Sequence, residues 1–589
     1  MAREPRRLFV GPGGESRRVE WSYPGMLSLQ AMALYRRGGP GLYVMSEDHG
    51  VYRKSFAFWG EGKETLSFEM IHLVEDPSLA RSSYVLPYSI VLGTFVGDWI
   101  TIAERYREWG TRQLWAQESR LMRGLVPDWV LKTGLWVWNR GRSAFVLDPA
   151  AAMQEALGLP VSVLWHWWHA GPYDTSFPDY LPPREGTESF QRALQKAHER
   201  GLHVLVYLNQ RLWCLSTPSW TKEGAERFAV RERDGRIRQE IYNVFDPKPC
   251  AAMDITTLFW RSKYAGLCET MVREYEVNGI YMDQAVSSLV CYDPGHGHPV
   301  GGGNYWMRGF RDLVAEIRRR FGEMRDRALA GEGAGEAWLS ELDLFLTLQV
   351  SWERYAEPGQ GWEVIPFFQA VYHPYGITFG NYSSLTIPPY DELWPTEYAP
   401  KEPLALLDRK YRRQFYLEQA RSFVWGMQPM LANFLPAQLE EHPEEMEYSL
   451  RLARLRYRTL PYLLHGTFLR PPELDVPEIE VPISRLSIYA GRRGGQTEWL
   501  GRFPAVLAGA WRAPNGAIGI ALASISDEPL SFVLRFDPLA YGLTRGGRIY
   551  RTDEKGRERF GTFGRGTTAL SLTLPARGAC VVEIEQGHR

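Results

Sequence analysis

The chain has 589 residues, with 68 Lys and Arg against 69 Asp and Glu and a formal net charge of −1. This balance provides no basic surface of the kind that binds nucleic acid, and a hydrophobic content of 44% is too high for a disordered chain. The length suits two to four domains, or one large barrel with additional domains.

The cysteines and the apolar runs bear on redox state, metal binding and location. The five cysteines are scattered and none lie at Cys-x-x-Cys spacing, so neither a zinc site nor a disulfide framework is predicted. Residues 1–18 lack the apolar run of a signal peptide, and no stretch reaches 18 uninterrupted apolar residues. We therefore expect a cytoplasmic protein, secreted only if an export signal is missing, with no membrane segment and no cofactor. No metal-binding residue is predicted, and whether a structural metal is bound stays open.

The first part of the chain reads as β-structure. From Trp21 to Ile90, alternating or apolar runs are separated by glycine-rich turns, and residues 98–115 have helical spacing. We place an N-terminal β-sandwich-like region with a helical linker at residues 1–120.

In the middle of the chain, strands and helices alternate, which is typical of a parallel α/β sheet or barrel. A (β/α)₈ TIM barrel over residues 121–470 accounts for eight candidate strands. These strands are 131–139, 161–165, 203–209, 279–283, 327–332, 342–349, 364–372 and 427–434.

The last part of the chain returns to short strands after the Pro- and acid-rich segment PPELDVPEIEVP. We expect an antiparallel β-sandwich at residues 471–589 that supports the barrel. No acidic residue in it ends a recognisable barrel strand, so we expect no catalytic group there.

Active sites of TIM barrels lie at the carboxyl ends of the strands, so the strand ends predict the site. Aromatic rings stack on the flat faces of sugars, and 20 of the 22 Trp precede residue 426. Amides and histidines can bind sugar hydroxyls. The candidate substrate-binding residues are Trp136, Trp138, Asn139, Trp165, His166, Trp167, Trp168, Asn209, Tyr281, Gln284, Tyr372 and His373.

Two carboxylates are the candidate catalytic residues. Asp283 ends an apolar strand and is the candidate nucleophile, although an aspartate here could also cap the next helix. Glu332 ends the following strand between two glycines and is the candidate acid/base, with Glu336 or Glu341 as alternatives. Glycoside hydrolysis requires such a pair, one to donate a proton and the other to attack or to activate water.

Several other residues have alternative interpretations. His166 with His169, or His296 with His298, could bind a metal, but other roles are favoured for both pairs. Cys214 and Cys291 are expected to be buried thiols rather than nucleophiles.

Five segments together resemble a known group of proteins: YPGMLSLQAMALY, GLYVMSEDHG, VLWHWWHAGPYDTSFPDYLP, GIYMDQ and WGMQPMLANF. They resemble an uncharacterised glycosidase-like family that is similar to the endo-α-N-acetylgalactosaminidase group of retaining α-glycoside hydrolases. The resemblance implies that Asp283 is the nucleophile and Glu332 the acid/base. It indicates a reaction class rather than a particular sugar.

The sequence thus predicts a retaining α-glycoside hydrolase whose partner is an oligosaccharide or glycoconjugate. Two alternatives remain open: a carbohydrate-binding barrel without catalytic activity, and a metal-dependent barrel hydrolase. The oligomeric state is not predicted.

Overall fold

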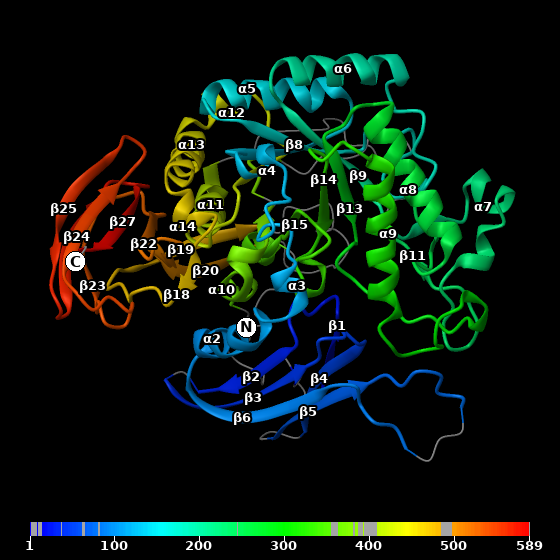
Figure 1. The fold of residues 1–589 in the computed structure, drawn as a ribbon. Helices are drawn as coiled ribbons and strands as arrows, with labels where there is room; N and C mark the ends of the chain where they lie inside the picture. The colour runs from blue at the N-terminus through cyan, green and yellow to red at the C-terminus, as the bar shows by residue number, and fades with distance from the viewer. Residues whose placement is uncertain are drawn as a thin grey trace.

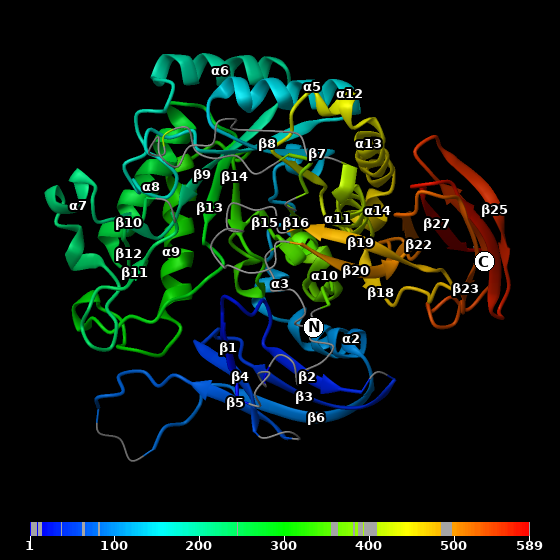
Figure 2. The same cartoon turned by 180° about the vertical axis from the view of Figure 1, so that it is seen from behind.

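The computed structural model describes residues 1, 9, 15–36, 38–61, 65–79, 83–243, 246–354, 363–380, 383–386, 393, 409–484 and 498–587. Its centre is a barrel, with the N-terminal sheets on one side and the C-terminal sheets on another (Figure 1 and, from behind, Figure 2).

Within these residues, eight parallel strands form the barrel. From β7 to β16, each strand pairs with the next strand of the barrel along the chain. The last strand, β17, pairs with β7, and a parallel bridge between Phe379 and Gln428 closes the ring. Most of their residues are buried, as expected for strands covered on both faces. The strands are β7 (Leu135–Arg140), β8 (Val161–His166), β9 (His203–Asn209), β13 (Gly279–Asp283), β14 (Ala328–Glu332), β15 (Leu344–Leu346), β16 (Ile377–Phe379) and β17 (Met430–Ala432).

Helices cover the outside of the barrel. In α6, Phe190, Leu194 and Ala197 form the buried stripe. The helices of this part are α4 (Asp128–Leu131), α5 (Leu147–Leu157), α6 (Thr187–Glu199), α7 (Pro218–Lys222), α8 (Leu258–Arg273), α9 (Tyr305–Phe321), α10 (Phe367–Tyr372), α11 (Arg412–Val424), α12 (Gln438–Glu441), α13 (Pro443–Arg458) and α14 (Leu460–Leu463).

The predicted seventh strand at 364–372 is wrong. Helix α10 occupies most of this segment, and the seventh strand is β16, a few residues later. Helix α10 packs against α2 (Trp99–Gly110) and β18 (Thr467–Leu469), so it is apolar on more than one side. A short apolar run of this kind fits a buried helix as well as a strand.

The N-terminal region contains two antiparallel three-stranded sheets. One has the order β1 (Arg18–Tyr23), β4 (Lys54–Glu61), β5 (Thr65–His72), and the other β2 (Ala31–Tyr35), β3 (Gly39–Glu47), β6 (Ser89–Gly97). Helix α2 follows, capped by the Asp98 carboxylate, which accepts the N–H groups of Ile100 and Thr101. The short helix α3 (Leu114–Gln117) leads into the barrel.

The C-terminal region is built from antiparallel sheets, as predicted. A six-stranded sheet lies between the barrel helices and a two-stranded sheet, and its far face has a core of its own. The six strands are β18, β21 (Val506–Arg512), β22 (Ile518–Ser524), β27 (Ala579–Gln586), β24 (Gly547–Thr552) and β25 (Arg557–Phe563); the pairs are β23 (Leu530–Phe536) with β26 (Thr568–Leu574) and β19 (Glu478–Ser484) with β20 (Glu498–Pro504).

No helix in the part of the chain that the structure describes is long and apolar enough to cross a membrane.

Candidate active site

Asp283 lies at the carboxyl end of β13 and is held by two donors from β9. The hydroxyl of Tyr207 and the amide of Asn209 both donate to its Oδ2, at 2.9 Å and 2.8 Å. Asn209 stands directly opposite Asp283 in the strand register, and Tyr207 stands opposite Tyr281. Paired residues of parallel strands face the same side, so alternate positions of both strands build one inward-facing site.

Glu332 lies beside Asp283 on the next strand. Met282 pairs with Gly331, which places the two carboxylates at equivalent ends of β13 and β14. Gln284 follows Asp283 with a φ of 57°, and its backbone N–H donates to Glu332 Oε2 at 3.0 Å. Gly333, on the other side of Glu332, has a φ of 85°, which glycine adopts without strain.

The two carboxyl groups act on each other electrostatically. Burial, and then the neighbouring Glu332 and Asp174 carboxylates, raise the pKa of Asp283 well above its usual range. Burial also raises the pKa of Glu332, against the opposing effect of the Gln284 N–H. Two close carboxylates cannot both ionise easily, so the pair holds one proton to a higher pH than isolated carboxyl groups would.

Aromatic rings form a layer inside the barrel, next to the carboxylates. The ring of His166 lies 4.7 Å from Tyr207, 5.5 Å from Tyr281 and 5.1 Å from Trp138, measured between centroids. Burial, and then Arg140 and His169, lower the pKa of His166 well below its usual value, so this imidazole is neutral. Its Nε2 is buried and has no hydrogen-bond partner among the described residues.

A cavity of about 1220 Å³ opens between the strand ends and the N-terminal sheets. Gln284 and Glu332 line it on the barrel side, together with Arg211. Arg211 forms an ion pair with Glu240, in which Nη2 donates to both carboxylate oxygens at 2.9 Å and 2.8 Å. The aromatic residues on the other walls of the cavity are Phe9, Trp21, Tyr35, Phe58, Trp99, Trp352, Phe367 and Phe368.

Some predicted binding residues lie in the barrel wall instead. The indole of Trp165 packs on Phe190 of α6, and that of Trp168 stacks on Tyr180 while donating to the carbonyl of Tyr207. Asn139 bonds the backbone of Phe145 and Phe434 and so ties loops together. Trp136 lies deep in the barrel, where it donates to Gln428. Trp167 packs on Tyr173 and lies beneath Arg140.

The structure also places Tyr372 and His373 away from the strand ends, because the segment before them is helix α10. The Tyr372 hydroxyl accepts from Trp115 and donates to Glu336, on the side where α2 and α3 pack. The ring of His373 lies 4.2 Å from that of Trp511 and bonds the carbonyls of Gly426 and Gly466, at the junction with the C-terminal sheets.

The two alternative acids lie outside the site. Glu336 is fully buried and accepts hydrogen bonds from the hydroxyls of Tyr23, Tyr106 and Tyr372. Glu341 pairs with Arg311 on the outside of the barrel, at 3.7 Å. Of these acids, only Glu332 lines the cavity at a strand end.

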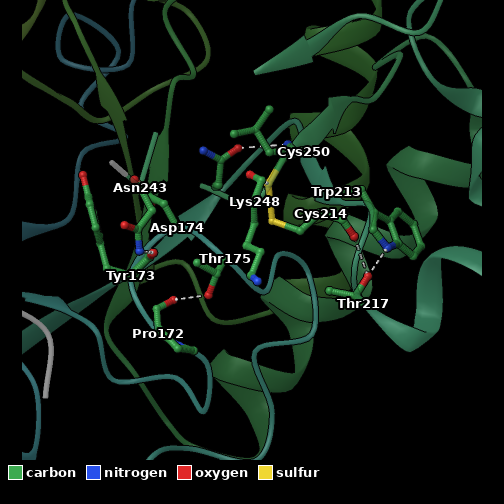
Figure 3. Close-up of a disulfide and its surroundings, with 12 residues drawn as sticks. Pro172, Tyr173, Asp174, Thr175, Trp213, Cys214, Thr217, Asn243, Lys248 and Cys250 are labelled. Carbon is green, nitrogen blue, oxygen red and sulfur yellow. Dashed lines mark hydrogen bonds between the residues drawn. A yellow bond between two sulfur atoms is a disulfide. The ribbon is translucent and has the colours of Figure 1, made fainter. Parts of the chain in front are cut away.

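A disulfide joins Cys214 of β10 (Leu212–Cys214) to Cys250 of β12 (Cys250–Ala252), which corrects the expectation of scattered thiols. β11 (Gln239–Glu240) completes this small sheet in the loop after β9. Figure 3 shows the disulfide facing the 172–175 loop, which is held by the Asn243 amide bonded to the carbonyl of Tyr173. Sequence spacing failed to reveal the pair because strand pairing, not a motif, brings the cysteines together.

Residues 84–383, about half of the chain, match the family model described as a domain of unknown function, DUF6259. The chain belongs to the DUF6259 family. It is 24% identical over 417 residues to a protein of Bacteroides thetaiotaomicron named "Putative glycoside hydrolase", covering 68% of this chain and 60% of that protein. It is 24% identical over 539 residues to "Putative glycoside hydrolase 22789" of Monosiga brevicollis, covering 82% of this chain and 42% of that protein. The DUF6259 chain thus spans about half the length of these relatives.

The fold of this DUF6259 protein is similar to that of a known glycosidase. The ligand-free structure of alpha-N-acetylgalactosaminidase NagBb from Bifidobacterium bifidum aligns with a TM-score of 0.55 at 13% identity, covering 87% of this chain and 76% of that chain. Its complex with GalNAc aligns with a TM-score of 0.54 at the same identity, covering 87% and 74%. These comparisons confirm the predicted barrel with β-sandwich regions and the resemblance to a glycosidase-like family.

Sequence reasoning missed several residues of the candidate site. Tyr207 was detectable, because it lies two residues before Asn209 on the same face of β9. Trp352 follows the sixth strand and reaches the cavity with 46% of its surface exposed. Asp174 and Glu240 come from long loops, and no spacing in the sequence indicates that they approach β9 and Gln284.

Proposed function

We propose that this protein is a retaining α-glycoside hydrolase in which Asp283 is the nucleophile and Glu332 the acid/base. The observation that carries the proposal is the placement of both carboxylates at paired ends of adjacent strands, where Glu332 lines a large cavity rich in aromatic residues. The relationship to proteins named as glycoside hydrolases supports it.

In the first step, an Asp283 oxygen attacks the anomeric carbon while Glu332 gives its proton to the departing glycosidic oxygen. An ester between Asp283 and the sugar results. In the second step, Glu332 removes a proton from water, which attacks the same carbon and releases Asp283. Two inversions at one carbon leave the α configuration unchanged.

Adjacent strands lie about 4.8 Å apart, so paired carboxylates fit the roughly 5–5.5 Å separation of retaining enzymes better than the roughly 6.5–9.5 Å of inverting ones. Tyr207 and Asn209 stabilise the negative charge on Asp283, as a nucleophile requires. The mutual repulsion of the pair keeps one proton on the two carboxyl groups. The proposed mechanism requires this proton to lie on Glu332, the general acid, when the substrate binds.

Several polar side chains near the two carboxylates can form hydrogen bonds with sugar hydroxyls. They are His166, Asp174, Arg211 with Glu240, and Gln284. Rings on the cavity walls can stack on further sugar units. We infer a substrate with more than one sugar unit, an oligosaccharide or a glycoconjugate. The volume of the cavity exceeds the roughly 300–1,000 Å³ of common small-molecule sites.

The test is a screen of aryl α-glycosides of galactose, N-acetylgalactosamine and glucose against the wild type and Asp283→Asn. The amide is nearly the same size as the carboxylate but cannot form the glycosyl ester. We expect turnover by the wild type with retention of configuration, seen by NMR of the first product, and a loss of roughly 10³-fold or more in Asp283→Asn. A folded Asn variant with full activity would refute the assignment.

A further inference from the structure

Four side chains with metal-binding atoms converge in the loops that follow β9 and β13. Asp254, Cys291, His296 and His298 each offer one such atom, and all four atoms lie within 4.8 Å of one another. Asp254 Oδ2 is 2.9 Å from His296 Nδ1 and 2.8 Å from His298 Nε2, and Cys291 Sγ is 3.5 Å from His296 Nδ1. Among the described residues, this is the one cluster of its kind.

The backbone fixes which nitrogen of each histidine faces the cluster. His296 Nε2 lies 2.9 Å from the carbonyl of Arg227, and His298 Nδ1 lies 2.7 Å from the carbonyl of Pro299. A carbonyl can only accept, so each ring carries its N–H on the far nitrogen. In the neutral imidazole, the other nitrogen then turns its lone pair into the cluster. Metal-binding histidines are oriented by such outer contacts.

The remaining two groups are also held in place. The N–H and hydroxyl of Thr256 donate to Asp254 Oδ1, which leaves Oδ2 for the cluster. The backbone N–H of Arg231 donates to Cys291 Sγ at 3.5 Å, a contact that stabilises a thiolate. The ring of Tyr305 stacks on His298, with centroids 4.0 Å apart.

The side chains of the cluster are also buried. The side chain of Asp254 is 0% exposed, and those of His296 and His298 are 4% exposed each. A divalent ion would neutralise one carboxylate and one thiolate, and two neutral imidazoles would complete four ligands. Sulfur and nitrogen donors favour zinc over calcium or magnesium, and four protein ligands form a closed site of the structural type.

We propose that Asp254, Cys291, His296 and His298 bind one zinc ion as a structural site. The ion would join two loops on the rim of the cavity (Figure 2 shows β10, β11 and β12 beside α8 and α9). Met253, next to Asp254, donates its N–H to the carbonyl of Arg211, and Arg211 bonds Ser287 in the loop that leads to Cys291. The zinc site therefore holds the loops that position Arg211 and Gln284.

The first test measures the metal content of the full-length protein, purified without chelator or histidine tag. We expect one zinc per chain by mass spectrometry, a lower melting temperature after its removal by a strong chelator, and recovery on addition of Zn²⁺ alone. Replacement by Co²⁺ should produce a thiolate-to-cobalt charge-transfer band, which reports Cys291 independently of activity. A chain without metal whose melting temperature is insensitive to chelator would overturn the proposal, as would a stoichiometric metal other than zinc.

The second test compares Cys291→Ser with Cys580→Ser, which removes a buried thiol of the C-terminal sheet. We expect Cys291→Ser to lose the cobalt band and most of the zinc, and Cys580→Ser to keep both. If Cys291→Ser does not fold, the wild-type metal content and cobalt spectrum decide alone. Equal cobalt bands in both variants would show that Cys291 is not a ligand.

Discussion

At the scale of single residues, the contribution of Glu332 to the rate should depend on how strongly the leaving group requires protonation. We expect Glu332→Ala to slow substrates with poor leaving groups by roughly 10²–10⁴-fold and activated aryl glycosides much less. Added azide should restore part of the rate with the activated substrate, because azide attacks the glycosyl enzyme without a general base. Equal losses on both kinds of substrate, with no azide rescue, would contradict the role of Glu332.

The Tyr207 hydroxyl stabilises the ionised form of Asp283 through a hydrogen bond. Tyr281, whose hydroxyl lies farther from the same carboxylate, provides a control for the loss of a tyrosine hydroxyl. The Tyr207 hydroxyl is 2.9 Å from Asp283, whereas that of Tyr281 is 3.5 Å from it. Removing a donor from a carboxylate raises its pKa, and a hydrogen bond to a charged group contributes roughly 1.5–3 kcal/mol, or about one to two pH units. We expect the acidic limb of the pH profile of kcat/KM to move upward by about one unit in Tyr207→Phe and less in Tyr281→Phe. Equal profiles in the two variants would contradict this.

Residue orientation explains which site predictions the structure supports. Alternate residues of a strand face opposite sides, so His166 and its neighbour Trp165 cannot both point into the barrel. His166 faces Tyr207 and Tyr281, and Trp165 faces α6. The sequence locates the strand end, but the register that selects one face depends on tertiary contacts.

At the scale of elements, Glu336 connects β1, α2 and α10 through three tyrosine hydroxyls. Burial raises the pKa of Glu336 to about 7. An unfolded glutamate titrates near about 4.3, so below that pH both states are protonated and the stabilisation from the raised pKa is complete. As the pH rises toward 7, the unfolded chain loses its proton first, and this contribution to stability is lost.

We therefore expect the free energy of unfolding of the wild type to fall between pH 5 and pH 7 more steeply than that of Glu336→Gln. The glutamine keeps the size and an acceptor oxygen but does not titrate. Denaturant unfolding at several pH values measures the difference, with Glu341→Gln, which removes the partner of Arg311, as the control. Parallel curves for the wild type and Glu336→Gln would show that Glu336 does not cause the pH dependence.

The elements themselves were largely predictable. Seven of the eight predicted strands overlap the strands of the barrel, because each is a short apolar run between turn residues. The run VIPFFQAVY could not be assigned correctly, because most of it forms a helix that is buried against both α2 and β18. Its apolar residues therefore do not show the one-sided pattern of a surface helix. For the same reason, Tyr372 and His373 were wrongly placed at the end of a barrel strand. The disulfide and the four-residue cluster lie in long loops, where distance along the chain does not predict proximity.

At the scale of the whole molecule, the C-terminal sheets are joined to the barrel by both apolar and polar contacts. The Trp511 indole packs on His373 and donates to the carbonyl of Val424. Arg470 pairs with Asp98 near the N-terminal region, and Tyr462 of α14 donates to Glu583 of β27. The face of the six-stranded sheet toward the barrel therefore forms part of the main core, to which it contributes Trp511 and Val581.

Removing residues 471–589 should thus expose the helices that this sheet covers, with lower solubility and a lower melting temperature as the result. No residue of this segment lines the cavity or contacts Asp283 or Glu332 among the described residues. We expect the folded fraction of the truncated protein to keep a substantial part of its kcat, measured per active site by trapping the glycosyl enzyme. A milder variant, Trp511→Ala, should lower the melting temperature in the same direction without changing KM. A truncated protein that is fully stable yet inactive would show that the C-terminal sheets contribute directly to the site.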